Sequence, residues 1–494
     1  MLRIPWFAGG VVSHSMGQQS RGAPTRFRPL PEVALTLLLL LLPLLASAYR
    51  VKGATAAGTD AAQEAPGHSH HGPYHSHGGV LQKMRALQRL KAVEWEMRMQ
   101  PLEELLERYK ARHNACVNAK KLPGKYLVVR FEDKDAGIGN QLPSVVSGLL
   151  LALMMDRCLF VEFPFFNKFF DHELDFSWKR HAKRLLAHGH NATEPENIPE
   201  RIPFGYVTIA DVWMFKNMTA YFDKNYGVEM WKDLDWSAAL LVNNPHHKDF
   251  IETYFPTRDI FAPLANFILR IKPKYDKKIK EFKHKNFKLF NIGMQIRRRK
   301  CNGDENELLC ELRPTIESYC TVARHIQLMH GLHDNDVRFF LAADEPETYT
   351  QKAAQVIKIL GADRVIFTDN GIAPSSSEKG VWNAADNPGT LESALQDMAL
   401  MAHCNDLVMT VASSFGYVAA AWGGYSPVHM VYGKHTNSQN PYWYRSISSE
   451  PCYWQAKNML RALDARAVNQ FRSNPLWMQY TQCHNDWNTD EQSS

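Results

Sequence analysis

The sequence predicts an α/β protein with two sheet-bearing halves behind an amino-terminal membrane anchor. Three observations lead to this prediction: an uncharged, leucine-rich run near the amino terminus, a strand–loop–helix–strand pattern after Lys125, and five strand patterns that alternate with four helical ones after residue 289. A chain of 494 residues is long enough for two or three domains. With 45% hydrophobic and 22% charged residues, its composition excludes collagen-like, disordered and polytopic membrane proteins.

The amino-terminal segment determines the predicted compartment. Residues 1–31 carry four arginines and no acid, and Val33–Tyr49 then contains no charge. Arginines before an apolar run of this length are typical of a cytosolic tail followed by a membrane-spanning signal anchor, so we expect a single-pass type II protein with a lumenal main part. A signal peptide cleaved near Ala46–Ala48 is the alternative. The glycosylation sequons at Asn191 and Asn217 fit both interpretations.

A stem is predicted between the anchor and the α/β part. Residues 51–79 are rich in Gly, Ala and His; the five histidines between His68 and His77 could bind a metal, but a flexible linker is the simpler interpretation. Apolar residues at steps of three or four from Val80 to Met97 predict an amphipathic helix. This helix could associate with itself and form a homodimer, or it could pack on the main domain.

The first α/β half begins with a strand–loop–helix–strand pattern. The predicted strands are Tyr126–Phe131 and Cys158–Val161; Gly137–Asn140 is a predicted turn, and Leu142–Met155 a predicted helix. Residues 165–280 are rich in aromatic side chains and give no clear pattern.

The second half has the clearest pattern of the chain. Alternating strands and helices predict a parallel, doubly wound sheet that is covered on both faces. Such sheets bind ligands beyond the carboxyl ends of their strands. The predicted strands are Phe290–Ile296, Val337–Ala342, Val365–Phe367, Leu407–Val411 and Val428–Val431, and the predicted helices are Thr315–His330, Glu347–Leu360, Leu391–His403 and Phe415–Trp422.

Three segments that follow predicted strands could bind an anion. Arg297–Lys300 come directly after the first strand of the second half, and guanidinium groups bind phosphate through paired hydrogen bonds. Ser413 and Ser414 begin a predicted helix, whose free amides attract anions. The glycines of Gly137–Asn140 allow close approach of a ligand to the backbone. Alone, each segment is more simply a solvated turn or a helix cap, but together they predict a diphosphate site.

Several other function classes lack their signatures in this sequence. There is no Rossmann glycine fingerprint and no Walker P-loop, which argues against a dehydrogenase and an ATPase. The net charge of +6 is spread along the chain without an arginine-rich arm, so we expect no nucleic-acid partner. No CxxC pair is present, which argues against a structural zinc site.

Four segments of the chain carry a resemblance to a known family. Gly137–Val161, Ile292–Arg297 and Asp397–Gly424 resemble the three motifs of plant-type xyloglucan fucosyltransferases, and Glu450–Cys452 resembles a short block near their carboxyl end. The likeness covers roughly residues 120–460, and the third motif is the most specific.

This resemblance implies a GT-B fold, in which two Rossmann-like halves face each other across a cleft. It implies a Golgi fucosyltransferase that transfers fucose from GDP-fucose to a glycan or polysaccharide acceptor with inversion, without a cofactor. The arginines and helix amides should hold the diphosphate without a metal ion. By this resemblance the donor is bound by Asn140, Arg297, Arg298, Asp397, Ser413, Ser414 and Phe415, with Asp397 at the guanine.

The catalytic base is less clearly implied. Gln295 and Lys300 stand where the related α1,6-fucosyltransferases carry His and Asp. Among the acids that follow, Glu305 has the spacing of their base, so it is our candidate for accepting the proton of the acceptor hydroxyl. The alternative is that Glu305 only balances the charge of the arginines.

Two other functions stay open. A metal-dependent GT-A glycosyltransferase would use an Asp-x-Asp triplet, and such triplets begin at Asp133, Asp233 and Asp334. A non-catalytic lumenal protein that binds glycans or nucleotide sugars would keep the fold without the activity.

The predicted organisation is a cytosolic tail (1–32), an anchor (33–49), a stem (50–113), an acceptor-side domain (114–280), a GDP-sugar domain (281–450) and a tail that packs back on both (451–494).

The eight cysteines should oxidise in the secretory lumen. They allow 105 complete pairings, so the sequence leaves the connectivity open. One hypothesis is a bridge between Cys301 and Cys310, which would order the loop after the arginine strand.

Overall fold

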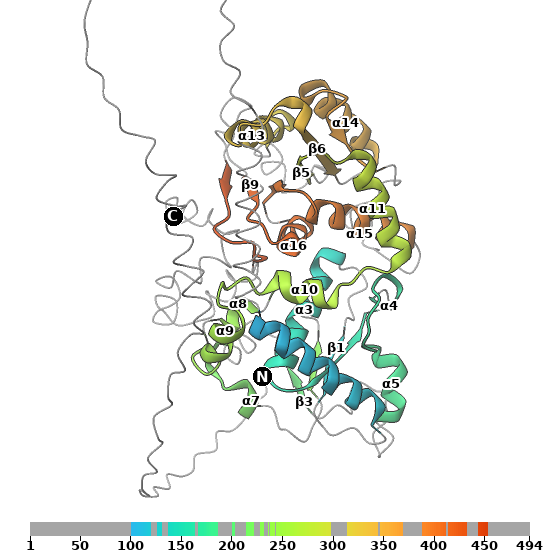
Figure 1. Ribbon diagram of the computed structural model, residues 1–494, viewed down its shortest axis with the longest axis vertical. Helices are drawn as coiled ribbons and strands as arrows, with labels where there is room; N and C mark the ends of the chain where they lie inside the picture. Colours follow the sequence, from blue (N-terminus) through green and yellow to red (C-terminus); the bar gives the residue numbers. More distant parts are fainter. Residues whose placement is uncertain are drawn as a thin grey trace, which may run out of the picture. The chain divides into compact units, whose positions relative to one another are not determined.

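The chain divides into two units, Met1–His77 and Gly78–Ser494, and every residue that the structure describes belongs to the second. No helix within these described residues is long and apolar enough to cross a membrane, and the predicted anchor Val33–Tyr49 lies outside them. The computed structural model (Figure 1) describes residues 100–119, 126–130, 137–163, 166–185, 200–202, 214–221, 228–231, 236, 238–242, 244–297, 314–343, 346–368, 388–411, 413–431 and 443–452.

The first sheet has four parallel strands in the order β2-β1-β4-β3. The predicted strand pair is confirmed as β1 (Tyr126–Arg130) and β2 (Cys158–Glu162), whose apolar residues are buried on both faces. β3 (Glu200–Ile202) and β4 (Val228–Trp231) come from the region without a sequence prediction.

Helix α3 (Ile138–Met154) connects β1 to β2. The predicted turn at Gly137–Asn140 is wrong, because α3 already begins at Ile138 and Gln141 N–H makes the helical bond to the carbonyl of Gly137 (3.3 Å). Between β2 and the second sheet, the described residues form α4 (Phe166–Phe169), α5 (Trp178–Leu185), α7 (Met218–Tyr221), α8 (Ala238–Leu241), α9 (Lys248–Tyr254), α10 (Phe261–Ile268) and α11 (Pro273–Asn286).

The second sheet has six strands in the order β10-β9-β8-β5-β6-β7. The five predicted strands are confirmed and are parallel: β5 (Phe290–Ile296), β6 (Val337–Ala343), β7 (Val365–Ile366), β8 (Asp406–Thr410) and β9 (Val428–Met430).

The sheet is mixed rather than wholly parallel, because an unpredicted edge strand, β10 (Trp443–Arg445), pairs antiparallel with β9. Its Arg445 is held by a bidentate ion pair: Nη1 lies 3.0 Å from Asp406 Oδ1, and Nη2 lies 2.7 Å from Asp406 Oδ2. A strand of three residues is too short for an alternation of apolar and polar residues to show, and the contact that holds it lies far away in the sequence, so it could not be predicted.

The helices around the second sheet begin and end close to their predicted bounds. They are α13 (Ile316–Met329), α14 (Pro346–Leu360), α15 (Pro388–Ala402) and α16 (Ser414–Gly423), with a short 3₁₀ turn η2 (Asp334–Asp336) before β6. Apolar residues of α3, α10, α15 and α16 share one buried core, so the cores of the two halves are continuous.

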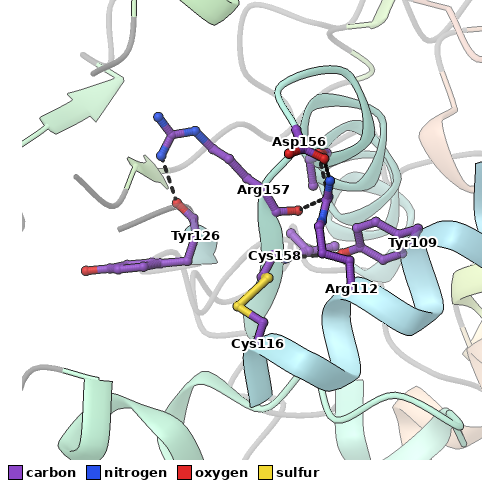
Figure 2. Close-up of a disulfide and its surroundings, with 9 residues drawn as sticks. Tyr109, Arg112, Cys116, Tyr126, Asp156, Arg157 and Cys158 are labelled. Atoms are coloured by element: carbon purple, nitrogen blue, oxygen red, sulfur yellow. Dashed lines mark hydrogen bonds and ion pairs between the residues drawn. A yellow bond between two sulfur atoms is a disulfide. The ribbon is translucent and has the colours of Figure 1, made fainter. Parts of the chain in front are cut away.

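A helix over residues 100–118, blue in Figure 1, packs on the first half. Its Leu102 and Tyr109 are buried in the same core as α3, and Tyr109 Oη accepts a hydrogen bond from Leu159 N–H (3.0 Å). A disulfide joins Cys116 at its end to Cys158 at the start of β2 (Figure 2). This part of the chain is therefore integral to the α/β fold and not a free-standing stem.

Arg112 of the same helix holds the end of α3 (Figure 2). Its guanidinium donates to the carbonyl of Arg157 (2.8 Å) and pairs with the carboxylate of Asp156. Asp156 has a φ of 57°, a left-handed conformation that aspartate tolerates better than most residues and that ends α3. The ion pair thus forms where the chain turns from α3 into β2.

We expect the Cys116–Cys158 disulfide to contribute substantially to stability. The two cysteines are 42 residues apart, and closing a loop of that length in the unfolded chain stabilises the fold by about 4 kcal/mol. The variant with both Cys116→Ser and Cys158→Ser should therefore unfold at a clearly lower denaturant concentration. Cys452 is disulfide-bonded as well, so reductant should destabilise the wild type more than this variant. Equal midpoints for both proteins without reductant would contradict the prediction.

Candidate functional site

The site is built at the carboxyl ends of β5 and β8, which are neighbours in the second sheet. Arg297 is the first residue beyond β5, and its backbone N–H donates to Thr410 Oγ1 of β8 (2.8 Å). Gln295 and Thr410 are buried at this edge, and Thr410 N–H donates to Gln295 Oε1 (3.2 Å). The end of the arginine strand is therefore fixed by a side chain of the neighbouring strand.

The start of α16 lies four residues beyond Thr410. Ser413 is the residue before the helix and is fully buried, yet its hydroxyl makes no capping bond. No hydrogen-bond partner for Ser413 Oγ exists in the described part of the chain. A buried hydroxyl without a partner costs free energy. Its position at a helix amino terminus, where amide N–H groups are unpaired, suits an anionic ligand.

The amino terminus of α3 meets the amino terminus of α16. A Cβ added to Gly139 would lie only 2.7 Å from the backbone nitrogen of Phe415 and 2.9 Å from its Cα, so only glycine fits here. This contact brings the first turn of α3, which includes the partly exposed Asn140, close to Ser414 and Phe415. Two helix amino termini, each with the positive end of its dipole, converge on one place.

Asp397 lies on α15 and faces the end of β7. Thr368, two residues beyond β7, donates from its Oγ1 to Asp397 Oδ1 (2.7 Å). Burial raises the pKa of Asp397 to about 7, although the bond from Thr368 opposes this rise. β7 is two strands from β5 in the sheet, which corresponds to about 10 Å. Asp397 thus lies along the same edge as Arg297, but apart from the helix amino termini.

Four further residues were predicted for the site or for glycosylation. Arg298, Glu305 and Asn191 lie outside the described residues, as does the proposed Cys301–Cys310 bridge. Asn217 is exposed, and its Oδ1 accepts from Ala220 N–H (3.1 Å) at the start of α7.

The structure also shows where one of the Asp-x-Asp triplets lies; these were the candidate metal ligands of the alternative function. Asp334 of the third Asp-x-Asp triplet precedes β6 instead of following a strand, and its Oδ1 is bound by Gln327 Nε2 (2.8 Å) and Arg364 Nη1 (2.5 Å). Asp133 and Asp233 lie outside the described residues. Within the described ranges, no group of three or more His, Cys, Asp or Glu side chains could hold a metal ion.

Sequence reasoning missed a buried carboxylate that joins the two halves. Glu450 accepts three hydrogen bonds, from Trp236 Nε1 (2.8 Å) and from the backbone N–H groups of Ile260 (2.7 Å) and Phe261 (2.9 Å) at the start of α10. Burial raises the pKa of Glu450 to about 8, although these donors oppose the rise. Helix α10 packs against both α3 and α16. The only signal in the sequence was the short block Glu450–Cys452, whose role its residues did not indicate.

Comparison with known proteins agrees with the resemblance predicted from the sequence. Residues 374–459 match the family model described as xyloglucan fucosyltransferase. This segment resembles xyloglucan fucosyltransferases. The fucosyltransferase-like segment contains Asp397, Thr410, Ser413 and Glu450, so most of the site residues on the second sheet fall inside it. No curated protein sequence matches the chain.

Three solved structures align with the chain over most of their own length. A mutant of FUT1 from Arabidopsis thaliana in complex with GDP is 16% identical, with 77% of this chain and 85% of FUT1 covered and a TM-score of 0.47. The α1,6-fucosyltransferase NodZ, from Bradyrhizobium, soaked with GDP-fucose, is 14% identical, with 65% and 98% covered and a TM-score of 0.39. POFUT1 in complex with GDP-fucose is 12% identical, with 62% and 96% covered and a TM-score of 0.34.

Proposed function

We propose that this protein is a GT-B fucosyltransferase that transfers fucose from GDP-fucose to a glycan acceptor with inversion at the sugar. The match of residues 374–459 supports this donor class. The observation that carries the proposal is the meeting of the α3 and α16 amino termini near the end of β5 and the hydroxyl of Ser413, which has no hydrogen-bond partner among the described residues. This arrangement suits a diphosphate, which needs several donors and positive charge in one place.

The arrangement also suits the length of a nucleoside diphosphate. With the phosphates at Ser413 and Arg297, the base would extend along the sheet edge toward β7. There the carboxylate of Asp397, already oriented by Thr368, would accept the N–H groups of a guanine.

The same residues account for the chemistry of an inverting transfer. The acceptor hydroxyl attacks the anomeric carbon of fucose on the face opposite the phosphate, and the bond from that carbon to the phosphate oxygen breaks. Negative charge then grows on the departing diphosphate, where Arg297 and the helix amides stabilise it. Glu305 is our candidate for accepting the hydroxyl proton.

We further propose that Val33–Tyr49 anchors the chain in the Golgi membrane with the catalytic part in the lumen. The arginines before this uncharged run support that topology. An anchored chain stays in membranes after alkaline carbonate washing. Recovery of a soluble form that begins near Tyr49 would show that a signal peptide had been cleaved instead.

Transfer by the purified unit Gly78–Ser494 tests the proposed function. We expect fucose from GDP-fucose to be transferred to members of a glycan array, with no transfer from UDP-sugars. Transfer that depends on added Mn²⁺ would favour the GT-A alternative. Binding of GDP without transfer to any acceptor would favour the non-catalytic binding protein.

We expect transfer to survive removal of divalent metal ions by EDTA. Arg297, the Ser413 hydroxyl and the helix amides can together offset the charge of the diphosphate without a cation. The measurement is the initial rate with excess EDTA and again after Mn²⁺ is added. Complete loss of activity that Mn²⁺ restores would contradict this prediction.

We expect GDP affinity to decrease as the pH falls through about 7. The raised pKa of Asp397 means that its carboxylate is protonated below that pH, and a protonated carboxyl accepts guanine N–H groups less well. Calorimetric titrations with GDP between pH 6 and pH 8 measure the effect. The Asp397→Asn variant should bind GDP more weakly and without this pH dependence; an unchanged pH profile in the variant would contradict the assignment.

A further inference from the structure

Two buried hydroxyl groups lie directly behind the backbone of Arg297. Thr410, the last residue of β8, is 1% exposed, and Tyr319 on α13 is fully buried. Thr410 Oγ1 accepts from Arg297 N–H (2.8 Å), lies 2.7 Å from the hydroxyl of Tyr319, and donates to the carbonyl of Gln295 (3.3 Å). Because the single proton of Thr410 goes to Gln295, Tyr319 donates to Thr410.

This arrangement uses the full hydrogen-bonding capacity of the threonine hydroxyl, which has one donor and two acceptor positions. It also ties three elements together: the end of β5, the end of β8 and helix α13. Ser413 follows Thr410 by three residues, so only two residues separate the bond to Arg297 from the residue before α16. A buried hydroxyl is not needed for the sheet itself, whose parallel strands pair through backbone groups.

We propose that Thr410, oriented by Tyr319, is a positioning residue of the diphosphate site: it fixes the backbone of Arg297 relative to the amino terminus of α16. The inference rests on the proposed function, because the rate of transfer is its main readout. Valine matches threonine in shape but lacks the hydroxyl, so Thr410→Val removes the side-chain acceptor of the part-buried Arg297 N–H and the hydroxyl that lies 2.7 Å from Tyr319. Thr410→Ser keeps the hydroxyl.

The test compares kcat and KM for GDP-fucose in wild type, Thr410→Val, Thr410→Ser, Arg297→Ala and the Arg297→Ala, Thr410→Val double variant. We expect Thr410→Val to lower kcat by about tenfold to a hundredfold, with a smaller change in KM, because a displaced arginine fails mainly in the transition state. Thr410→Ser should recover most of this loss. Once Arg297 is replaced, Thr410→Val should lower kcat by no more than about threefold, since the two residues act together.

A matched control separates positioning from stability. The control is Thr315→Val. Thr315 lies at the start of α13, and its Oγ1 accepts from Ser318 N–H (3.2 Å). This variant therefore removes a different threonine hydroxyl, one that does not bond Arg297. It should lower the unfolding midpoint and leave kcat unchanged. The inference is overturned if Thr410→Val keeps the wild-type kcat, or if it lowers kcat by the same factor with and without Arg297.

Failure of the proposed function would be recognised separately. If the wild type binds GDP but transfers no fucose, the activity is wrong, and the GDP affinity of the same variants then decides the inference. Positioning requires that Thr410→Val weaken GDP binding when Arg297 is present and not when it is alanine. Equal weakening in both backgrounds would overturn it.

Discussion

Arg297→Ala should lower kcat by about a hundredfold to a thousandfold, or ~3–4 kcal/mol, the usual cost of removing one preorganised transition-state contact. Arg297 follows a buried strand, and its N–H is held by Thr410 (2.8 Å), so its backbone position does not depend on its own side chain. The variant should therefore fold normally. Steady-state kinetics with GDP-fucose, together with the thermal unfolding midpoint, measure both effects.

Two further variants test how Arg297 acts. Arg297→Lys should recover little activity, because an ammonium restores the charge but not the paired geometry of a guanidinium. Arg338→Ala is the matched control, since Arg338 lies on β6 near the amino end of that strand, at the opposite edge of the same sheet. It should leave kcat nearly unchanged. If Arg297→Ala retains more than about a third of the wild-type kcat, well under the 1.4 kcal/mol of a tenfold change, the diphosphate assignment is wrong.

Glu450→Ala should destabilise the protein by about 3 kcal/mol or more, because it leaves three buried donors without an acceptor and each costs ~1–3 kcal/mol. Those donors are the indole N–H of Trp236 and two backbone N–H groups at the start of α10. Chemical denaturation followed by circular dichroism measures the change. A midpoint within error of the wild type would contradict the structural role of Glu450.

The Glu450→Gln variant distinguishes the bond from the indole N–H of Trp236 from the bonds of the two backbone N–H groups of α10. The carbonyl of glutamine can still accept from both α10 amides, but its NH₂ group would face the indole N–H of Trp236, so two donors would meet. We expect a smaller loss than for alanine. Replacing Trp236 by Phe in the Gln background should then cost less than the same replacement in the wild type, because the clash disappears. Equal costs in both backgrounds would show that this bond does not contribute.

Much of the second half could be predicted from the sequence alone. The strands β5, β6 and β8 are short, almost wholly apolar runs, as buried parallel strands require, and the helices between them show their own apolar period. The position of a strand also locates its carboxyl end. That is why Arg297 and Ser413 could be assigned to one edge of a sheet before any coordinates were known.

The first half and the edge strands of the sheets were harder to predict from the sequence. β3, β4 and β10 have three or four residues each, too few for a period to show, and they exist because a neighbouring strand offers its backbone groups. The turn predicted at Gly137–Asn140 was wrong for a related reason. Glycine favours turns locally, but here Gly139 is required inside a helix by the close approach of Phe415.

The sequence by itself therefore determined the α/β class, the second sheet, the basic and serine-containing segments at its edge and the resemblance to xyloglucan fucosyltransferases. Only the tertiary structure decided that α3 and α16 meet at their amino termini, that Thr410 holds Arg297, that Cys116 pairs with Cys158 and that Glu450 binds α10. The physical reason is distance along the chain. Apolar periods and helix caps arise from neighbouring residues, whereas each of these contacts joins residues tens to hundreds of positions apart and forms only when the whole core has packed.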